Sequence, residues 1–114
     1  MIYTFMIKVY LISNGGDDKR YKIGYTKRKV ENRVKEFKTG NSNDFEIISV
    51  FESKWASKIE AALHKRFCYS KIEGEWFYLT ESEVRNFSNE CQNLHNIFEI
   101  LNNQNTYIID RGGL

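Results

Sequence analysis

The sequence contains no proline, two cysteines and no long run of apolar residues. Without proline, we expect neither slow prolyl isomerisation nor a proline kink in any helix. Cys68 and Cys91 are isolated rather than paired in a CxxC motif, which favours free thiols in a reducing, cytoplasmic setting. A membrane-spanning helix needs about 18 apolar residues in a row, so we expect no membrane segment.

The length and composition are those of a small globular protein. The chain has 114 residues, which predicts one domain over residues 1–114. We place its core at about residues 7–80 and a C-terminal helix and tail at residues 81–114. Aromatic residues make up 15% of the chain, so an aromatic-rich core is expected.

The charge is distributed unevenly along the chain. Residues 1–71 hold 15 basic and 8 acidic residues, a net charge of +7, whereas residues 72–114 hold 2 basic and 7 acidic residues, a net charge of −5. A basic body with an acidic C-terminal section is typical of a protein with a polyanion-binding face. A lysine-rich surface that is merely solvated is the alternative interpretation.

Alternating and helical periodicities predict the order of the elements. Strands are expected at 7–13, 20–25, 45–51, 76–79 and 107–109, and helices at about 28–38, 54–67 and 81–101. The turn sequence NGGDD joins the first two strands as an antiparallel hairpin. We therefore predict an α+β fold, in which helices flank a small antiparallel or mixed three-stranded sheet. Its core order is β-β-α-β-α, followed by the C-terminal helix.

Polar residues indicate where the helices begin and end. Thr26 and Ser53 are candidate N-caps of the first two helices, and Thr39-Gly40 is a stop signal for the first. Thr80 and Glu83 match a capping box before the third helix. These signals set the predicted helix boundaries.

The third predicted helix carries an apolar seam spaced alternately by three and four residues. Its members are Val84, Phe87, Cys91, Leu94, Phe98 and Leu101. The seam can pack on the sheet or pair with another copy as a homodimer. Packing on the sheet is favoured, because a small α+β domain needs one apolar stripe per helix.

Arg33 lies where the first helix should bury an apolar residue. It is three residues after Val30 and one before Val34, which define the apolar stripe. An inward guanidinium is costly unless it meets a carboxylate or a phosphate, and its planar fork fits both. A snorkelling arginine or a structural salt bridge is the alternative.

Glu60 and His64 border the apolar stripe of the second helix, four residues apart. Such a pair can share a site or bind a metal. A carboxylate that holds one divalent cation beside an arginine is an arrangement that can cleave phosphodiester bonds. The attacking water also needs a base, and the candidates on the hairpin are Tyr10, Tyr21, Tyr25 and Lys22.

Two hairpin segments carry a resemblance to a known family. In KVYLISN, residues 8–14, Tyr10 and Asn14 match the tyrosine and asparagine of the motif GIY-x-[IL]-x-N. In YKIGYTK, residues 21–27, Lys22-Ile23-Gly24 stands in place of Tyr-Ile-Gly. These segments resemble the first and second motifs of the GIY-YIG endonuclease family, with Lys8 and Lys22 as departures from it.

Downstream residues extend the resemblance to residues 8–84. Arg33 matches the helix arginine of the family, and Glu60 matches its downstream glutamate. The segments IEAALHKRF (59–67) and GEWF (74–77) are similar to a phage- and bacteria-associated branch. That branch shows K-I-G-x-T, E-x-x-L-H-x-x-F and G-E-W-F in this order. The resemblance also implies an intracellular enzyme of the kind that phages encode.

The resemblance implies a metal-dependent DNA endonuclease with named site residues. Glu60 would hold one divalent metal ion, Mg²⁺ or Mn²⁺, and Arg33 would contact the scissile phosphate. Tyr10 would act as general base or position the water. Lys22 would take over the place of the second tyrosine, as a phosphate contact or as a neighbour that lowers the pKa of Tyr10. His64 and Glu75 would lie near the cleft.

The basic segment before the first helix is a candidate DNA contact. Lys27, Arg28 and Lys29 are expected to follow the DNA backbone, together with His64 from the second helix. A solvated first turn is the alternative for the three basic residues. Because Lys22 replaces a family tyrosine, the alternative function is a nucleic-acid-binding module with weak catalysis on the same fold.

Overall fold

The computed structural model describes residues 7–15, 20–37 and 45–110, with side chains described for residues 7–15, 20–35 and 45–103. The helices and strands, in chain order, are β1 (Lys8–Ser13), β2 (Arg20–Thr26), α1 (Val30–Phe37), β3 (Glu46–Glu52), α2 (Ala56–Arg66), a 3₁₀ turn η1 (Cys68–Ser70), β4 (Lys71–Glu73), β5 (Trp76–Tyr78), α3 (Glu81–Arg85) and α4 (Phe87–Asp110).

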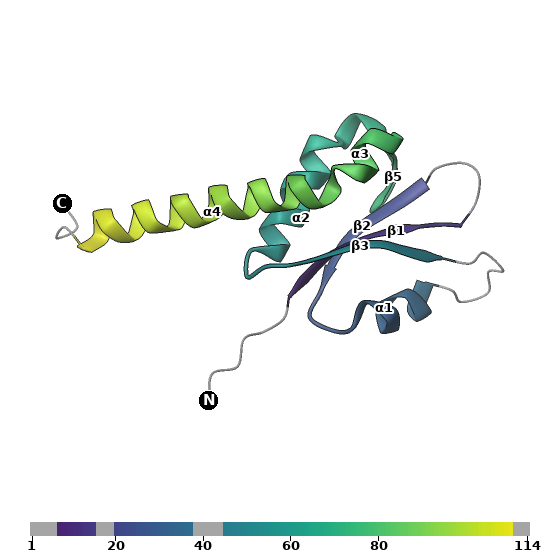
Figure 1. Ribbon diagram of the computed structural model, residues 1–114, viewed down its shortest axis with the longest axis horizontal. Coiled ribbons are helices and arrows are strands. Elements are labelled where there is room, and N and C mark those ends of the chain that lie inside the picture. Colours follow the sequence, from purple (N-terminus) through teal and green to yellow (C-terminus); the bar gives the residue numbers. More distant parts are fainter. Residues whose placement is uncertain (1–6, 16–19, 38–44, 111–114) are drawn as a thin grey trace.

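The strands form one antiparallel sheet in the order β3-β1-β2-β5-β4 (Figure 1). The three long strands agree with the prediction. The sheet has five strands rather than the predicted three, because β5 pairs with β2 and the unpredicted β4 pairs with β5. A three-residue strand is too short to show an alternating pattern. Gly74, with φ 57°, makes the tight turn that places β4 against β5.

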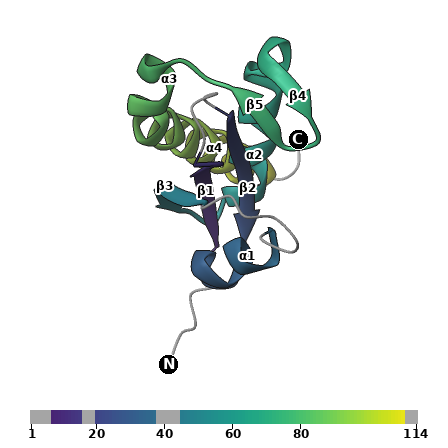
Figure 2. The ribbon, with the colours of Figure 1, turned by 90° about the vertical axis from the view of Figure 1, so that its right-hand side faces the viewer.

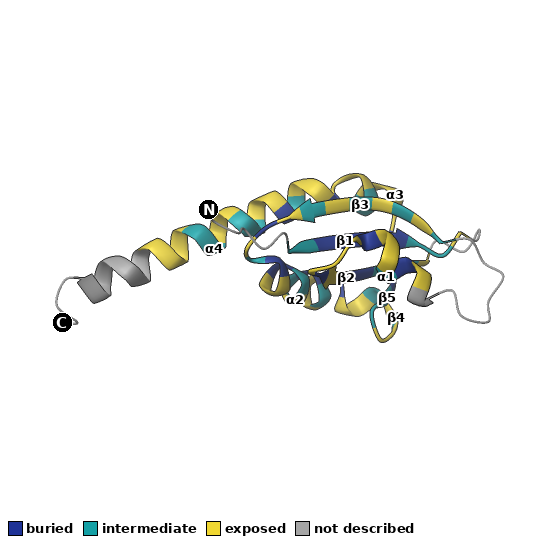
Figure 3. Cartoon of the chain, turned by 90° about the horizontal axis from the view of Figure 1, so that it is seen from below, coloured by how far each residue is buried: buried dark blue, intermediate teal, exposed yellow. Residues whose placement is uncertain are grey.

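α1 covers one face of the sheet, and α2 and α4 cover the other (Figure 2). Because side chains alternate along a strand, Val9 and Leu11 face α2, whereas Tyr10 and Ile12 face α1. The buried stripe on α2 consists, as predicted, of Ala56, Ile59 and Leu63, and Phe67 follows it. Figure 3 shows β1 as the most buried strand, between the two layers of helices.

Two helices begin later than predicted. Thr26 is the last residue of β2, and its Oγ1 accepts a hydrogen bond from the backbone of Arg28 at 3.0 Å. Ser53 likewise accepts one from the backbone of Trp55 at 2.9 Å, and α2 begins at Ala56. Both side chains therefore stabilise the turn before a helix instead of capping its first residue. The predicted stop at Thr39-Gly40 lies outside the described residues.

The capping box is confirmed. The backbone of Glu83 donates to Thr80 Oγ1 at 3.1 Å, and the backbone of Thr80 donates to Glu83 Oε1 at 2.9 Å. The predicted third helix is divided at Asn86 into α3 and the long α4. The predicted strand at 107–109 is wrong, since α4 continues to Asp110. Figure 1 shows this end of α4 projecting from the sheet, where a strand would have no neighbour with which to pair.

Only the first part of the apolar seam packs inside the molecule. Phe87 and Cys91 are buried, and Leu94 and Phe98 pack against the core, whereas Leu101 is exposed. Both cysteines are free thiols, as predicted. No helix in the described part of the chain has the length and apolar character required to span a bilayer.

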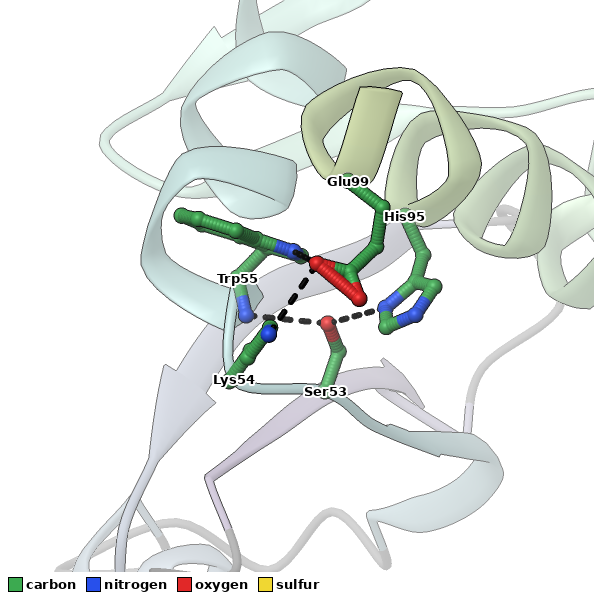
Figure 4. A network of polar contacts seen from close by, with 5 residues as sticks. All are labelled: Ser53, Lys54, Trp55, His95 and Glu99. Atoms are coloured by element: carbon green, nitrogen blue, oxygen red, sulfur yellow. Dashed lines mark hydrogen bonds and ion pairs between the residues drawn. The ribbon is translucent and has the colours of Figure 1, made fainter. Parts of the chain in front are cut away.

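Polar contacts fix α4 to the turn that leads into α2 (Figure 4). The Ser53 hydroxyl lies 2.7 Å from His95 Nδ1. Glu99 accepts a hydrogen bond from the Trp55 indole at 3.2 Å and forms an ion pair with Lys54 at 3.0 Å. His95 therefore has a structural contact with the turn before α2.

Candidate functional site

The candidate site lies at an edge of β2 that is only partly covered. β5 pairs with Arg20, Tyr21 and Lys22, and the backbone of Ile23 donates one further bond to Glu75 O at 3.1 Å. Within the described part of the chain, the rest of β2, from Gly24 to Thr26, has no strand on this side. We call this segment the open edge of β2.

Tyr10 reaches the open edge by passing over a glycine. Tyr10 on β1 is the cross-strand partner of Gly24 on β2. A Cβ atom at position 24 would lie 2.6 Å from Tyr10 Cζ, closer than real Cβ atoms approach other atoms. The missing side chain therefore lets the buried Tyr10 ring lie across β2, with its hydroxyl directly over Gly24.

The charges around the Tyr10 hydroxyl come from both faces of the sheet. Burial raises the pKa of Tyr10, and hydrogen bonding and positive charge from Arg33 on α1 oppose this rise. The negative charges of Glu75 and Glu60 raise the pKa of Tyr10 further. Arg33 and Glu60 thus both act on Tyr10, and we call these three residues the edge cluster.

Glu60 brings a shielded carboxylate from α2 to this cluster. Its side chain is 14% exposed, and burial raises its pKa. The charge of His64 opposes this rise, that of Glu75 reinforces it, and that of Lys22 opposes it. A cation would stabilise the ionised form of Glu60, since loss of water otherwise disfavours the charge.

Lys22 lies on the same face of β2 as Gly24 and Tyr10. Its Nζ is 3.0 Å from Glu75 Oε1 and 5.6 Å from the centre of the Trp76 ring. Its side chain is 13% exposed. The structure therefore places Lys22 in an ion pair beside the edge cluster.

His64 takes the place of a strand neighbour at Ile23, next to the open edge. Its Nε2 donates a hydrogen bond to the Ile23 carbonyl at 2.8 Å, and its ring packs edge-on against Phe77 at 4.8 Å between centroids. The same nitrogen lies 3.8 Å from Glu60 Oε2. His64 thus ties α2 to β2, next to the carboxylate of Glu60, and its predicted contact with DNA stays a prediction.

The other predicted DNA contacts lie beyond the end of β2. Lys27, Arg28 and Lys29 are exposed and connect β2 to α1. Lys8 Nζ donates a long hydrogen bond to the Arg28 carbonyl at 3.5 Å. Tyr21 packs into the core on the α2 face, opposite to the face that carries Tyr10, whereas Tyr25 is 44% exposed.

The donor set of the edge cluster fits one kind of metal site. Within the described residues, no three His, Cys, Asp or Glu side chains form a group that could hold a metal ion by themselves. Mg²⁺, however, is commonly bound through one or two carboxylates, with water and substrate phosphates completing its shell. The half-buried carboxylate of Glu60 fits that pattern, and Glu60 alone is the candidate protein ligand.

Two contacts of the site were not predicted from the sequence. One is the ion pair between Lys22 and Glu75, and the other is the hydrogen bond from His64 to the Ile23 carbonyl. The motif GEWF identified Glu75 as a candidate, and the spacing of Glu60 and His64 identified His64. Neither signal indicated which atoms meet.

This antiparallel sheet, with helices on both faces, defines the chain as a small α+β domain, an architecture compatible with a nuclease-like fold. The chain belongs to the T5orf172 domain family, which it matches over residues 7–92. This is a GIY-YIG-like domain related to phage endonucleases. Comparison with curated proteins and with solved structures gave no match.

Proposed function

We propose that the protein is a metal-dependent endonuclease that hydrolyses phosphodiester bonds of DNA. The supporting observation is the edge cluster, in which a tyrosine, an arginine and a glutamate from three elements interact electrostatically. A basic segment, Lys27–Lys29, lies at the adjacent end of β2. A nuclease-like domain with this site would take DNA as its substrate.

In this proposal, Arg33 binds the scissile phosphate. Its guanidinium is half-buried on α1 and acts on the Tyr10 hydroxyl. A phosphate is a negative group that the planar guanidinium can bind through two parallel hydrogen bonds. The fixed positive charge also stabilises the additional negative charge that develops on the phosphate during hydrolysis.

Tyr10 orients the attacking water through its hydroxyl. Because burial raises the pKa of Tyr10, Oη keeps its proton at neutral pH. Arg33 opposes this rise, so the buried Oη lies beside a positive group, and a water that reached it would be oriented there. Positioning by a neutral hydroxyl is therefore a better description of Tyr10 than proton abstraction by a phenolate.

Glu60 holds the divalent metal ion, Mg²⁺ or Mn²⁺, which when bound stabilises negative charge on the phosphate and lowers the pKa of water. Lys22 and His64 keep the surroundings of the Glu60 carboxylate positive or neutral. Lys22 lowers the pKa of Glu60, and so does the charge of His64. Both effects favour the ionised carboxylate, which is the form that a cation requires.

A second candidate is a nucleic-acid-binding module with weak catalysis on the same fold. It is favoured by one observation: Lys22 replaces a tyrosine of the family motif and is engaged with Glu75 at 3.0 Å. In this case, DNA binding would be sensitive to salt and would persist without metal.

Cleavage of plasmid and linear DNA with Mg²⁺ or Mn²⁺ tests the proposal. The Glu60→Gln variant keeps the shape of the side chain and should lose more than about 100-fold in rate, because it removes the carboxylate that binds the metal. Glu52→Gln, which changes an exposed carboxylate on β3, is the matched control and should cleave like wild type.

Cleavage that survives in Glu60→Gln would show that the rate comes from a contaminating nuclease or from another site. A wild-type protein that binds DNA without cleaving it under any of these conditions would favour the binding module. Absence of binding at low salt would exclude both functions.

A further inference from the structure

Lys22 is confined more tightly than its proposed contact with DNA requires. The lysine stem has four rotatable bonds, and an exposed ammonium usually samples many positions. Here Nζ is held 3.0 Å from Glu75 Oε1, above the Trp76 ring, in a side chain that is 13% exposed. An acidic and an aromatic side chain therefore both limit where the charge lies.

Glu75 is itself fixed to β2 by the backbone. Its carbonyl accepts the hydrogen bond from the Ile23 backbone at 3.1 Å, and the next residue, Trp76, pairs with Lys22 in the register of β2 and β5. Gly74 makes the turn immediately before it, with φ 57°. These backbone contacts thus fix the position of the Glu75 main chain relative to Lys22.

Stability alone is a weak explanation for this ion pair. The Glu75 side chain is 38% exposed, and an ion pair with such an exposed partner adds little to stability. A carboxylate near a phosphate-binding site also repels the ligand. Its charge already raises the pKa of Tyr10 and of Glu60. A group with this electrostatic disadvantage is better explained by what it does to Lys22.

We propose that Glu75 is a positioning residue, whose carboxylate holds the Lys22 ammonium beside the edge cluster so that the ammonium meets a phosphate of bound DNA. Glu75 acts through Lys22 and does not contact the DNA. The inference rests on the proposed function for its ligand, DNA, and it holds for a protein that binds DNA as well as for one that cleaves it.

A double-mutant cycle tests this dependence. The variants are Lys22→Gln, Glu75→Gln and the double variant, each measured for DNA affinity in EDTA and for kcat and KM with Mg²⁺. In the presence of Glu75, Lys22→Gln should lower DNA affinity or kcat about tenfold, because a positioned phosphate contact is lost. In the Glu75→Gln background, the same substitution should cost less than about twofold.

The matched control removes a carboxylate that does not hold Lys22. Glu73 is exposed on β4, two residues before Glu75, and Glu73→Gln changes the net charge by the same amount. In the Glu73→Gln background, Lys22→Gln should still cost about tenfold. Glu75→Asp keeps a shorter carboxylate and should restore part of the dependence. If thermal unfolding shows that Glu75→Gln does not fold, Glu75→Asp takes its place in the double-mutant cycle.

The outcomes separate this inference from the proposed function. Equal losses for Lys22→Gln in the Glu75 and Glu75→Gln backgrounds would overturn the positioning role. If the wild-type protein binds DNA but never cleaves it, the endonuclease proposal fails, and the cycle in EDTA still decides the role of Glu75. If DNA does not bind at low salt, both fail together.

Discussion

The Tyr10 ring occupies the space that a side chain at position 24 would need. The two residues are cross-strand partners, and a Cβ atom at position 24 would lie 2.6 Å from Tyr10 Cζ. Gly24 has no unusual backbone angle that would demand glycine. Glycine is therefore required at position 24 because the Tyr10 ring passes over it.

Gly24→Ala should destabilise the protein by about 1–3 kcal/mol, because the methyl group overlaps a buried ring that cannot move freely. In a Tyr10→Leu background, the same change should cost much less, since the overlap is gone. Chemical denaturation of the single and double variants measures this coupling.

Gly74→Ala is the control for the effect of backbone strain. Gly74 has φ 57°, and a Cβ atom at this position would meet nothing within 4 Å, so its substitution should cost about 1 kcal/mol whatever stands at position 10. If the cost at Gly24 were equally independent of Tyr10, the ring would not be the cause.

Glu60→Gln should stabilise the metal-free protein at pH 7. Burial raises the pKa of Glu60, so the folded state favours its protonated form and loses stability as the pH rises through that pKa. The neutral glutamine avoids this loss and should raise Tm by about 2–4 °C at pH 7. Below about pH 4, where glutamate is protonated in both states, the gain should disappear.

Thermal unfolding in EDTA at the two pH values gives this comparison. Glu52→Gln, at an exposed position on β3, should show no such gain. A glutamine variant that is less stable than wild type at pH 7 without metal would mean that the ionised carboxylate is stabilised by its neighbours. Stabilisation by Glu60→Gln is what we expect at a functional site, where activity requires a charge that destabilises the folded state.

His64→Ala should destabilise the protein by about 1–3 kcal/mol, because it leaves the Ile23 carbonyl without the donor that lies 2.8 Å away. His64→Gln offers another N–H and should cost less. Denaturation measures stability, and the salt dependence of DNA affinity tests for a phosphate contact. A lower salt slope in His64→Gln, with stability unchanged, would assign His64 to the DNA instead.

One thiol per folded molecule should react with a maleimide at pH 8. Cys68 is exposed, whereas burial raises the pKa of Cys91 to about 12, which keeps it as an unreactive thiol. Mass spectrometry should find the label on Cys68 and none after Cys68→Ser. Rapid labelling of Cys91 in the folded protein would contradict the packing of α4 against the core.

The sequence predicted those parts of the fold that depend on local periodicity. Alternation located the three long strands, and the stripe through Ile59 and Leu63 located α2. The wrong predictions concern segments whose structure is determined by tertiary contacts rather than by local periodicity. Thr26 and Ser53 are good capping residues, but each bonds within the preceding turn. The segment 107–109 is rich in β-formers, yet it continues α4 because no strand lies beside it.

The candidate site was predictable as a set of residues rather than as a set of contacts. Motif order named Tyr10, Arg33 and Glu60, and α1 and α2 bring the last two to the tyrosine from opposite faces. The partner of Lys22 could not be read from the sequence, because it depends on the register between β2 and β5. That register is set by a three-residue strand, which has no pattern of its own.

The shortness of β5 determines how much of β2 lacks a neighbouring strand on that side. β5 ends its pairing with β2 near Lys22, and the open edge of β2 begins where this pairing stops. A hairpin of β4 and β5 that was longer by two residues would continue along Gly24 and close that side of the sheet, with every residue of the edge cluster unchanged. The length of this hairpin thus determines how much of the β2 edge is covered by a neighbouring strand.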